Sequence, residues 1–257
     1  MTVDNPLEAN NEANRRQRPI FFLHNPKAGG SSLRSAFRSL FNPSEAAPFF
    51  CNSPVDYRQS KSTLHRHGGY AFYAGHYGYD VFRQLRAGHA LITNFRDPVE
   101  RIISLYRYWR NNVSAGNLMG AYPNDATVIM HSHELDFSSF IRCEDPDVRL
   151  YINNFHFRQL LNSGWENVTI RTWHKIKVRG RISAMPWFYI ADKPRLSTIL
   201  LKRAFPELLS PNLPFENIGR GDPIEVTSKD VEYLVSLNRF DYDIYHHALR
   251  EQLARFT

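Results

Sequence analysis

A lysine, two adjacent glycines and two serines follow the apolar run PIFFLH near the N-terminus. Such a run is typical of a buried strand, and the apolar spacing after the glycines is that of a helix face. A turn from a strand into a helix exposes backbone N–H groups at the positive end of the helix dipole. Lys27 adds a charge, Gly29 and Gly30 allow close approach, and Ser31 and Ser32 add hydroxyl donors. These residues predict an anion site, although a tight turn with a solvated lysine would explain them equally well.

Arg96 and Ser104 form a second arrangement that suits an anion. Arg96 follows the predicted strand 89–95, and Asp97 with the proline after it is a strong helix start. On that helix Ser104 shares a face with Asp97 and Arg101, opposite the apolar face, so we expect it to point toward the ligand-binding end of the sheet. In the alternative interpretation Arg96 pairs with Asp97 or Glu100, and Ser104 is an ordinary polar helix residue.

Together the two arrangements resemble the nucleotide-binding motifs of sulfotransferases. The stretch NPKAGGSSL is similar to their 5′-phosphosulfate loop, P-K-[TS]-G-[GST]-[TS]-[ST], except that Ala28 stands where a threonine or serine is common. It does not fit the loop of P-loop nucleoside triphosphatases, whose lysine follows the last glycine. The pair Arg96 and Ser104 resembles the sulfotransferase element that holds the 3′-phosphate of the cofactor.

A third stretch, FYAGHYGYDVF, resembles the element that carries the general base in the heparan sulfate 2-O-sulfotransferase and uronyl sulfotransferase family. In this chain the base would be His76. The order of the three elements matches that family over residues 20–110, and the later pieces FENIG and FDYDIYHHAL match it more loosely.

The resemblance implies 3′-phosphoadenosine 5′-phosphosulfate (PAPS) as co-substrate and an in-line transfer of its sulfuryl group to an acceptor hydroxyl. His76 would act as the base and Lys27 would stabilise the leaving group, with no metal required. Cofactor contacts are expected at Lys27, Ala28, Gly29, Gly30, Ser31, Ser32, Arg96 and Ser104. We expect a carbohydrate acceptor, either an acidic glycan or a glycolipid, and Arg34 and Arg38 on the first helix could contact an acidic sugar.

Strands alternate with helices along the chain, which predicts an α/β fold with a mostly parallel central sheet flanked by helices. The resemblance makes it a P-loop-like sulfotransferase fold. Predicted strands are 19–24, 70–76, 89–95, 168–173 and 187–192. The first helix has its apolar face at Leu33, Ala36, Phe37, Leu40 and Phe41 and ends at Asn42-Pro43. Further helices are expected from Asp97, over 136–143, from Pro194 to 205, and over 228–256. Loops are expected over 43–69, 111–135, 173–186 and 210–223, and Asn217–Arg220 could cover the adenosine.

Length and composition favour a single domain over 19–257 after a disordered head, 1–18. The net charge of +7 indicates an anionic partner. A non-catalytic module that binds acidic polysaccharide or nucleic acid would explain that charge, but not the three ordered motifs; we therefore expect no nucleic-acid partner. A small-molecule kinase lacks the required lysine position and a magnesium carboxylate.

Targeting and cysteine signals are sparse. No apolar run approaches the roughly 20 residues of a membrane span, so we expect a soluble, intracellular protein, cytoplasmic in a bacterium. A lumenal domain separated from its anchor would have the same features. Cys51 and Cys143 are the only cysteines, and two inert thiols or one bridge would both fit. The histidine pairs 65/67, 131/133 and 246/247 lack further ligands at metal-binding spacing.

Overall fold

The computed structural model describes residues 18–47, 69–85, 88–113, 125–206 and 223–257. Within them a four-stranded sheet has the order β2-β1-β3-β4, and every pairing is parallel. The strands are β1 (Ile20–Leu23), β2 (Phe72–Gly75), β3 (Ala90–Phe95) and β4 (Tyr189–Ile190). The predicted α/β fold with a parallel sheet is confirmed.

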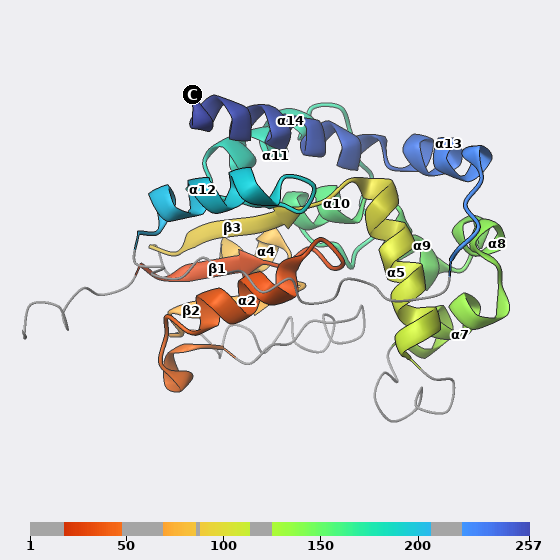
Figure 1. Ribbon diagram of the computed structural model, residues 1–257, viewed down its shortest axis with the longest axis horizontal. Helices are drawn as coiled ribbons and strands as arrows, with labels where there is room; N and C mark the ends of the chain where they lie inside the picture. The colour runs from red at the N-terminus through yellow and green to blue at the C-terminus, as the bar shows by residue number, and fades with distance from the viewer. Residues whose placement is uncertain (1–17, 48–68, 86–87, 114–124, 207–222) are drawn as a thin grey trace, which may run out of the picture.

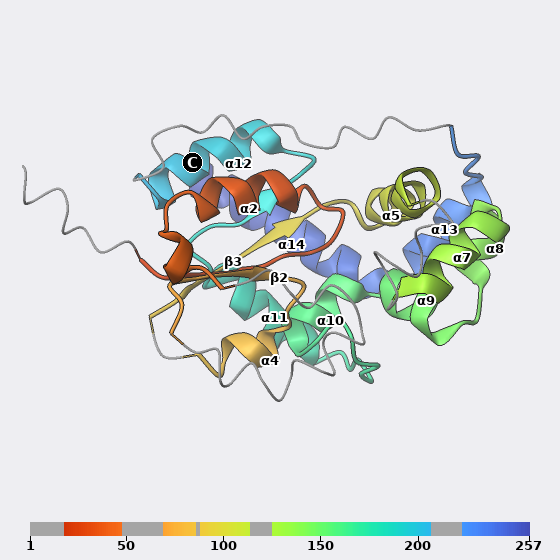
Figure 2. The ribbon, with the colours of Figure 1, turned by 90° about the horizontal axis from the view of Figure 1, so that it is seen from below.

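Both faces of the sheet are buried, because successive side chains of each strand point to opposite sides. Ile20 and Phe22 face a cluster shared with α2 (Gly30–Arg38) and α12 (Pro194–Ala204). Phe21 and Leu23 face a larger cluster built from the remaining helices. These helices include α4 (Tyr79–Phe82), α5 (Pro98–Asn112), α10 (Phe155–Leu161), α11 (His174–Ser183) and α14 (Arg239–Phe256). Figure 2 shows the sheet between α2 and α12 on one side and α4, α10 and α11 on the other.

More helices gather around α5 beyond the carboxyl end of the sheet, as Figure 1 shows. They are α7 (Ala126–Glu134), α8 (Phe137–Arg142), α9 (Pro146–Ile152) and α13 (Ser228–Leu237). The predicted loop 111–135 is therefore wrong over α7, where Val128 and Ile129 are buried. The predicted loop 43–69 begins with a short 3₁₀ helix, η1 (Pro43–Glu45), capped by Asn42.

Two expectations near residue 170 are wrong. The predicted strand 168–173 is irregular, and the predicted loop 173–186 contains α11. The backbone of this stretch turns instead of extending: the Arg171 N–H donates to His174 Nδ1 (3.0 Å), and the His174 N–H donates to the Arg171 carbonyl (3.0 Å). The alternation of Val168 and Ile170 reflects partial packing on the core, since both are only half-buried.

Several expectations lie outside the described residues: almost all of the disordered head, most of the loops 43–69 and 210–223, the histidines at 65 and 67, the Asn217–Arg220 loop, and Cys51. Cys143 is described and is a free thiol. Among the described helices, none is both long enough and apolar enough to cross a bilayer.

The strand order creates a switch point at the carboxyl ends of β1 and β3. The chain leaves β1 through α2 on one face of the sheet and leaves β2 through α4 on the other face. Because β3 then pairs with the opposite side of β1, the segments that follow β1 and β3 diverge at their carboxyl ends. In open α/β sheets ligands bind in the crevice that this divergence opens.

Candidate functional site

The segment between β1 and α2 has an unusual backbone. Lys27 has φ 63° and Gly29 has φ 76°, both in the left-handed region. Glycine adopts this conformation without cost, whereas a lysine does so only where its surroundings hold it. Gly29 is also the N-cap of α2 and has no side chain to cap the helix. The N–H groups of the first turn therefore face the crevice as an anion-binding end of the helix.

Asn94 of β3 holds this segment in place. Its Oδ1 accepts from the Asn25 N–H (2.8 Å), while its Nδ2 donates to the carbonyls of Asn25 (2.9 Å) and Ala28 (3.0 Å). The side chain is fully buried, so water does not compete for these hydrogen bonds. One amide thus fixes both ends of the Asn25–Ala28 turn and explains how Lys27 keeps its left-handed conformation.

Gly30 is required by the close approach of α2 to His24. A Cβ at this position would lie 2.1 Å from His24 Cδ2 and Nε2, and 3.0 Å from Asn94 Nδ2. Gly29 has less severe neighbours, since a Cβ there would lie 3.0 Å from Tyr189 Cε1. The second glycine of the motif is therefore determined by packing, and the first by its backbone conformation.

Lys27 and Arg96, which are far apart in the sequence, lie side by side. Arg96 Nη1 donates to the Lys27 carbonyl (3.3 Å), and the Lys27 ammonium lies 4.0 Å from the centre of the Tyr108 ring on α5. Burial, and then the charge of Arg96, lower the pKa of Lys27 to about 8. Both residues thus lie together at the carboxyl end of the sheet, where a ligand with two anionic groups would offset the mutual repulsion of the two cations.

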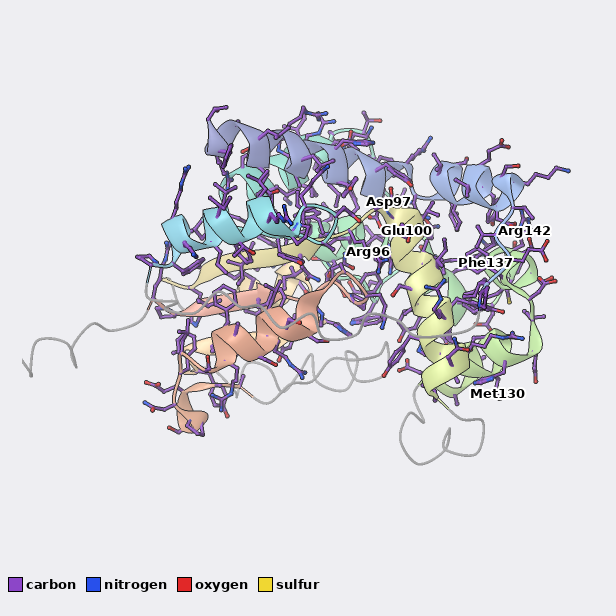
Figure 3. The ribbon with its side chains drawn as sticks, viewed as in Figure 1. Arg96, Asp97, Glu100, Met130, Phe137 and Arg142 are labelled. Atoms are coloured by element: carbon purple, nitrogen blue, oxygen red, sulfur yellow. The ribbon has the colours of Figure 1, made fainter. Side chains whose placement is uncertain are left out.

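Arg96 also takes part in the ion pair that the alternative interpretation expected. Its Nη2 lies 3.4 Å from Glu100 Oε2, and both side chains are partly exposed. Asp97 is not its partner: it caps α5 by accepting from the N–H groups of Val99 (2.9 Å) and Glu100 (3.1 Å). Figure 3 shows Arg96, Asp97 and Glu100 together where β3 joins α5. An exposed pair of this length is weak, so Arg96 can exchange Glu100 for a phosphate at little cost.

The predicted polar face of α5 is only partly correct. Arg101 is fully buried rather than directed toward a ligand, and its Nη2 donates to the Tyr151 carbonyl (2.8 Å). Ser104 is half-buried, and Tyr108, one turn further on, lies under the Lys27 ammonium. Because residues four apart on a helix share a face, Ser104 lies on the side of α5 that borders the crevice.

His76 follows β2 at the same edge of the sheet and is half-buried beside His24, with 4.9 Å between the ring centres. Its backbone is fixed by Trp165, whose Nε1 donates to the His76 carbonyl (2.9 Å). Gln159 joins the neighbouring segments: its Nε2 donates to the carbonyls of His24 (3.1 Å) and Tyr77 (2.7 Å). The ends of β1 and β2 are therefore tied together by residues of α10 and the segment that follows it.

His24 is buried beside His76. Its pKa is lowered well below the usual value, by burial first and then by His76, Arg34 and Lys27. His24 is therefore neutral at pH 7. Arg38, in contrast, ends α2 by donating to the Phe41 carbonyl (2.9 Å), so its role is structural.

The remaining loop residues have different surroundings. The Ala28 methyl group is fully buried, so a hydroxyl at this position would not face solvent. Ser31 is half-buried and Ser32 is 9 % exposed, both in the first turn of α2. Of these two serines, Ser31 is the more exposed.

Among the described residues, a small pocket of about 10 Å³ lies at this site, lined by Asn25, Arg96, Arg101 and others. Within the described part of the chain no group of three potential metal ligands occurs. His133 Nε2 contacts the Val113 carbonyl (2.8 Å), and His131 lies 3.5 Å from Asp145. A cavity of about 190 Å³ lies at the opposite end of the sheet, next to Trp187, Leu200 and other residues of α12 and α14.

The sequence did not identify the residues that support the site. Asn94 leaves a signal, because it is a polar residue near the end of an otherwise apolar strand. His24 leaves a similar signal at the end of β1. Gln159 and Trp165 leave none, because only the packing of α10 and its following segment against the strand ends brings them to the site.

Comparisons with known proteins add no assignment, since no protein-family model matches the chain and no curated protein matches it.

Proposed function

We propose that the protein is a PAPS-dependent sulfotransferase that transfers a sulfuryl group to a hydroxyl of a carbohydrate acceptor. The observation that supports this most directly is the contact between the two predicted anion-binding motifs. Arg96 donates to the carbonyl of Lys27 itself (3.3 Å), although the two residues are 69 positions apart. A nucleotide with anionic groups at both ends requires two such motifs at one crevice.

The residues fit this co-substrate. The left-handed Lys27 and Gly29, together with the start of α2 that no side chain caps, would supply backbone N–H donors to the 5′ end. We assign the 3′-phosphate to Arg96, which contacts the Lys27 carbonyl, and to Ser104, which lies one turn before Tyr108 on α5. PAPS supplies an activated sulfuryl group, whose sulfur–oxygen bond to the 5′-phosphate breaks as the bond to the acceptor oxygen forms.

Lys27 and His76 carry the chemical roles in this proposal. The ammonium of Lys27, still largely protonated at pH 7 with a pKa of about 8, neutralises charge on the departing phosphate. His76 removes the acceptor proton, and its side chain follows β2 at the edge where Lys27 follows β1. Asn94 and Trp165 keep the two in position through the backbone contacts of their segments.

The first experiment compares nucleotides by thermal shift. Adenosine 3′,5′-bisphosphate should raise the melting temperature clearly, and ATP, which lacks a 3′-phosphate, should raise it far less. Arg96→Met should reduce the shift with the bisphosphate, whereas the matched control Arg203→Met on α12, remote from the crevice, should not. Equal shifts with the two nucleotides in the native protein would contradict the assignment of Arg96 and Ser104 to the 3′-phosphate.

The second experiment measures transfer from labelled PAPS to a panel of acidic and neutral glycans and glycolipids. His76→Ala should abolish transfer and leave bisphosphate affinity within about twofold, because the base contacts the acceptor rather than the nucleotide. The exposed His246 on α14 provides a matched control, and His246→Ala should transfer normally. Unchanged turnover in His76→Ala would exclude His76 as the base.

A further inference from the structure

Helix α11 has apolar residues on two opposite faces. Val178 and Ile182 are fully buried against the core. On the other side, Trp173 at the N-cap is 55 % exposed and Ile176 is 77 % exposed. A Cβ on Gly180, one turn after Ile176, would meet nothing within 4 Å, so this face is open. Core packing therefore explains the inner face only.

Two exposed cations flank these apolar side chains. Arg171 and Lys177 are exposed, and burial, followed by the charges of Lys177 and Arg171, lowers the pKa of His174. The other cations of the helix have partners: Lys175 and Arg179 contact Asp243, and Arg181 donates to the Leu160 and Leu161 carbonyls. We call Arg171, Trp173, Ile176 and Lys177 the α11 outer face. Figure 2 shows α11 beside α4 and α10, on the side of the sheet away from α2.

We propose that the α11 outer face binds the surface of a bilayer that contains anionic phospholipid. An indole and a branched aliphatic side chain between cations match the boundary between headgroups and acyl chains, where tryptophan is favoured and lysine and arginine contact lipid phosphate. The positive charge of the α11 outer face favours an anionic bilayer over the other possible partners. A second copy of this face would bring cations against cations, and an acidic polymer would leave Ile176 exposed to water.

Because the α11 outer face is small, we expect weak binding to the bilayer. It offers two apolar side chains, so insertion alone is marginal, and attraction of Arg171 and Lys177 to anionic lipid supplies the rest. Attachment is therefore reversible and weakened by salt. The same chain segment carries Trp165, whose indole contacts the His76 backbone, so attachment would hold the candidate site near the membrane. The inference does not depend on the proposed reaction.

Trp173 provides a built-in probe for the test. The chain has four tryptophans, and the other three, Trp109, Trp165 and Trp187, are at most 4 % exposed. We would titrate the full chain with phosphatidylcholine vesicles containing about 30 % phosphatidylserine, a charge density in the range of cytoplasmic leaflets. Tryptophan emission should shift to shorter wavelength, and the protein should float with the vesicles. Trp173→Phe should float but lose the spectral shift.

Matched variants decide the outcome. Ile176→Ser should weaken vesicle partitioning about tenfold, the factor expected for removing one aliphatic side chain from the apolar phase. Lys177→Glu should weaken it further and reduce its salt dependence. Leu253→Ser, which removes another exposed apolar side chain, on α14, should have no effect. The proposal is overturned if anionic vesicles do not bind, if Leu253→Ser weakens binding as much as Ile176→Ser, or if the face mediates dimers or heparin binding instead. Because no nucleotide or acceptor is present, failure here leaves the sulfotransferase proposal untouched.

Discussion

Asn94→Ala tests whether one buried amide builds the anion-binding turn. The substitution removes the three hydrogen bonds that hold Asn25 and Ala28, at 2.8, 2.9 and 3.0 Å. A net contribution of about 1 kcal/mol for each bond gives a loss of about 3 kcal/mol in the free energy of unfolding. For a domain of this size that corresponds to a fall of roughly 6–12 °C in melting temperature.

The same substitution should weaken nucleotide binding beyond its effect on stability. Without Asn94, the turn is already formed in only a fraction of the molecules, and the ligand must order it in the rest. The apparent affinity is therefore reduced in proportion to that fraction. We expect at least about a tenfold weaker affinity for adenosine 3′,5′-bisphosphate, measured by calorimetry well below the melting temperature.

Asn238→Ala is the matched control for this prediction. Asn238 is equally buried, but it lies between α13 and α14, where its Oδ1 accepts from the Asn154 N–H (2.8 Å) and its Nδ2 donates to the Leu234 carbonyl (3.0 Å). This variant should lose about 2 kcal/mol and bind the bisphosphate normally. The reasoning is refuted if Asn94→Ala loses less than about 1 kcal/mol, or if the two variants bind nucleotide equally well.

Three further predictions concern the crevice. Gly30→Ala should lower the melting temperature and the bisphosphate affinity, because its methyl group would lie 2.1 Å from His24; calorimetry showing native affinity would contradict this packing. Bisphosphate affinity, titrated from pH 6 upward, should fall as pH rises through about 8, the lowered pKa of Lys27, because the ammonium loses its charge there. The bisphosphate affinity of Lys27→Arg should stay constant over that range, because arginine keeps its charge. A parallel decline in both proteins would show that a group other than Lys27 titrates. Trp165→Phe should reduce transfer while sparing bisphosphate affinity, because it releases the His76 carbonyl; single-turnover rates equal to those of the native protein would disprove the positioning role.

The fold was largely predictable because its periodicities are local. Strands β1, β2 and β3 are mostly apolar runs of four, four and six residues, and α12 begins at Pro194 as its apolar period indicates. The segment 168–173 shows where local pattern fails. Its alternation is that of a strand, but the backbone there bonds to His174 and Arg171 within its own turn.

The candidate site was also only partly predictable from the sequence. Lys27, the glycines, the serines and Arg96 could be selected from the sequence, because their types and spacing predicted an anion site. The burial of Arg101 could not be predicted: its place on α5 suggested a ligand-facing residue, yet it packs against α9 and its Nη2 donates a hydrogen bond to the Tyr151 carbonyl. Whether a charged residue on a helix is buried depends on the element that packs against it.

By itself the sequence determined the parallel α/β architecture and the short motifs, because hydrophobic period, capping residues and glycine conformations act within a few residues of the chain. Only the tertiary structure decided that Lys27 lies against Arg96 and Tyr108, that Asn94 and Trp165 hold the turns, and that Ile176 faces outward. These contacts join residues far apart in the chain, and they form only where strand order and helix packing bring the segments together.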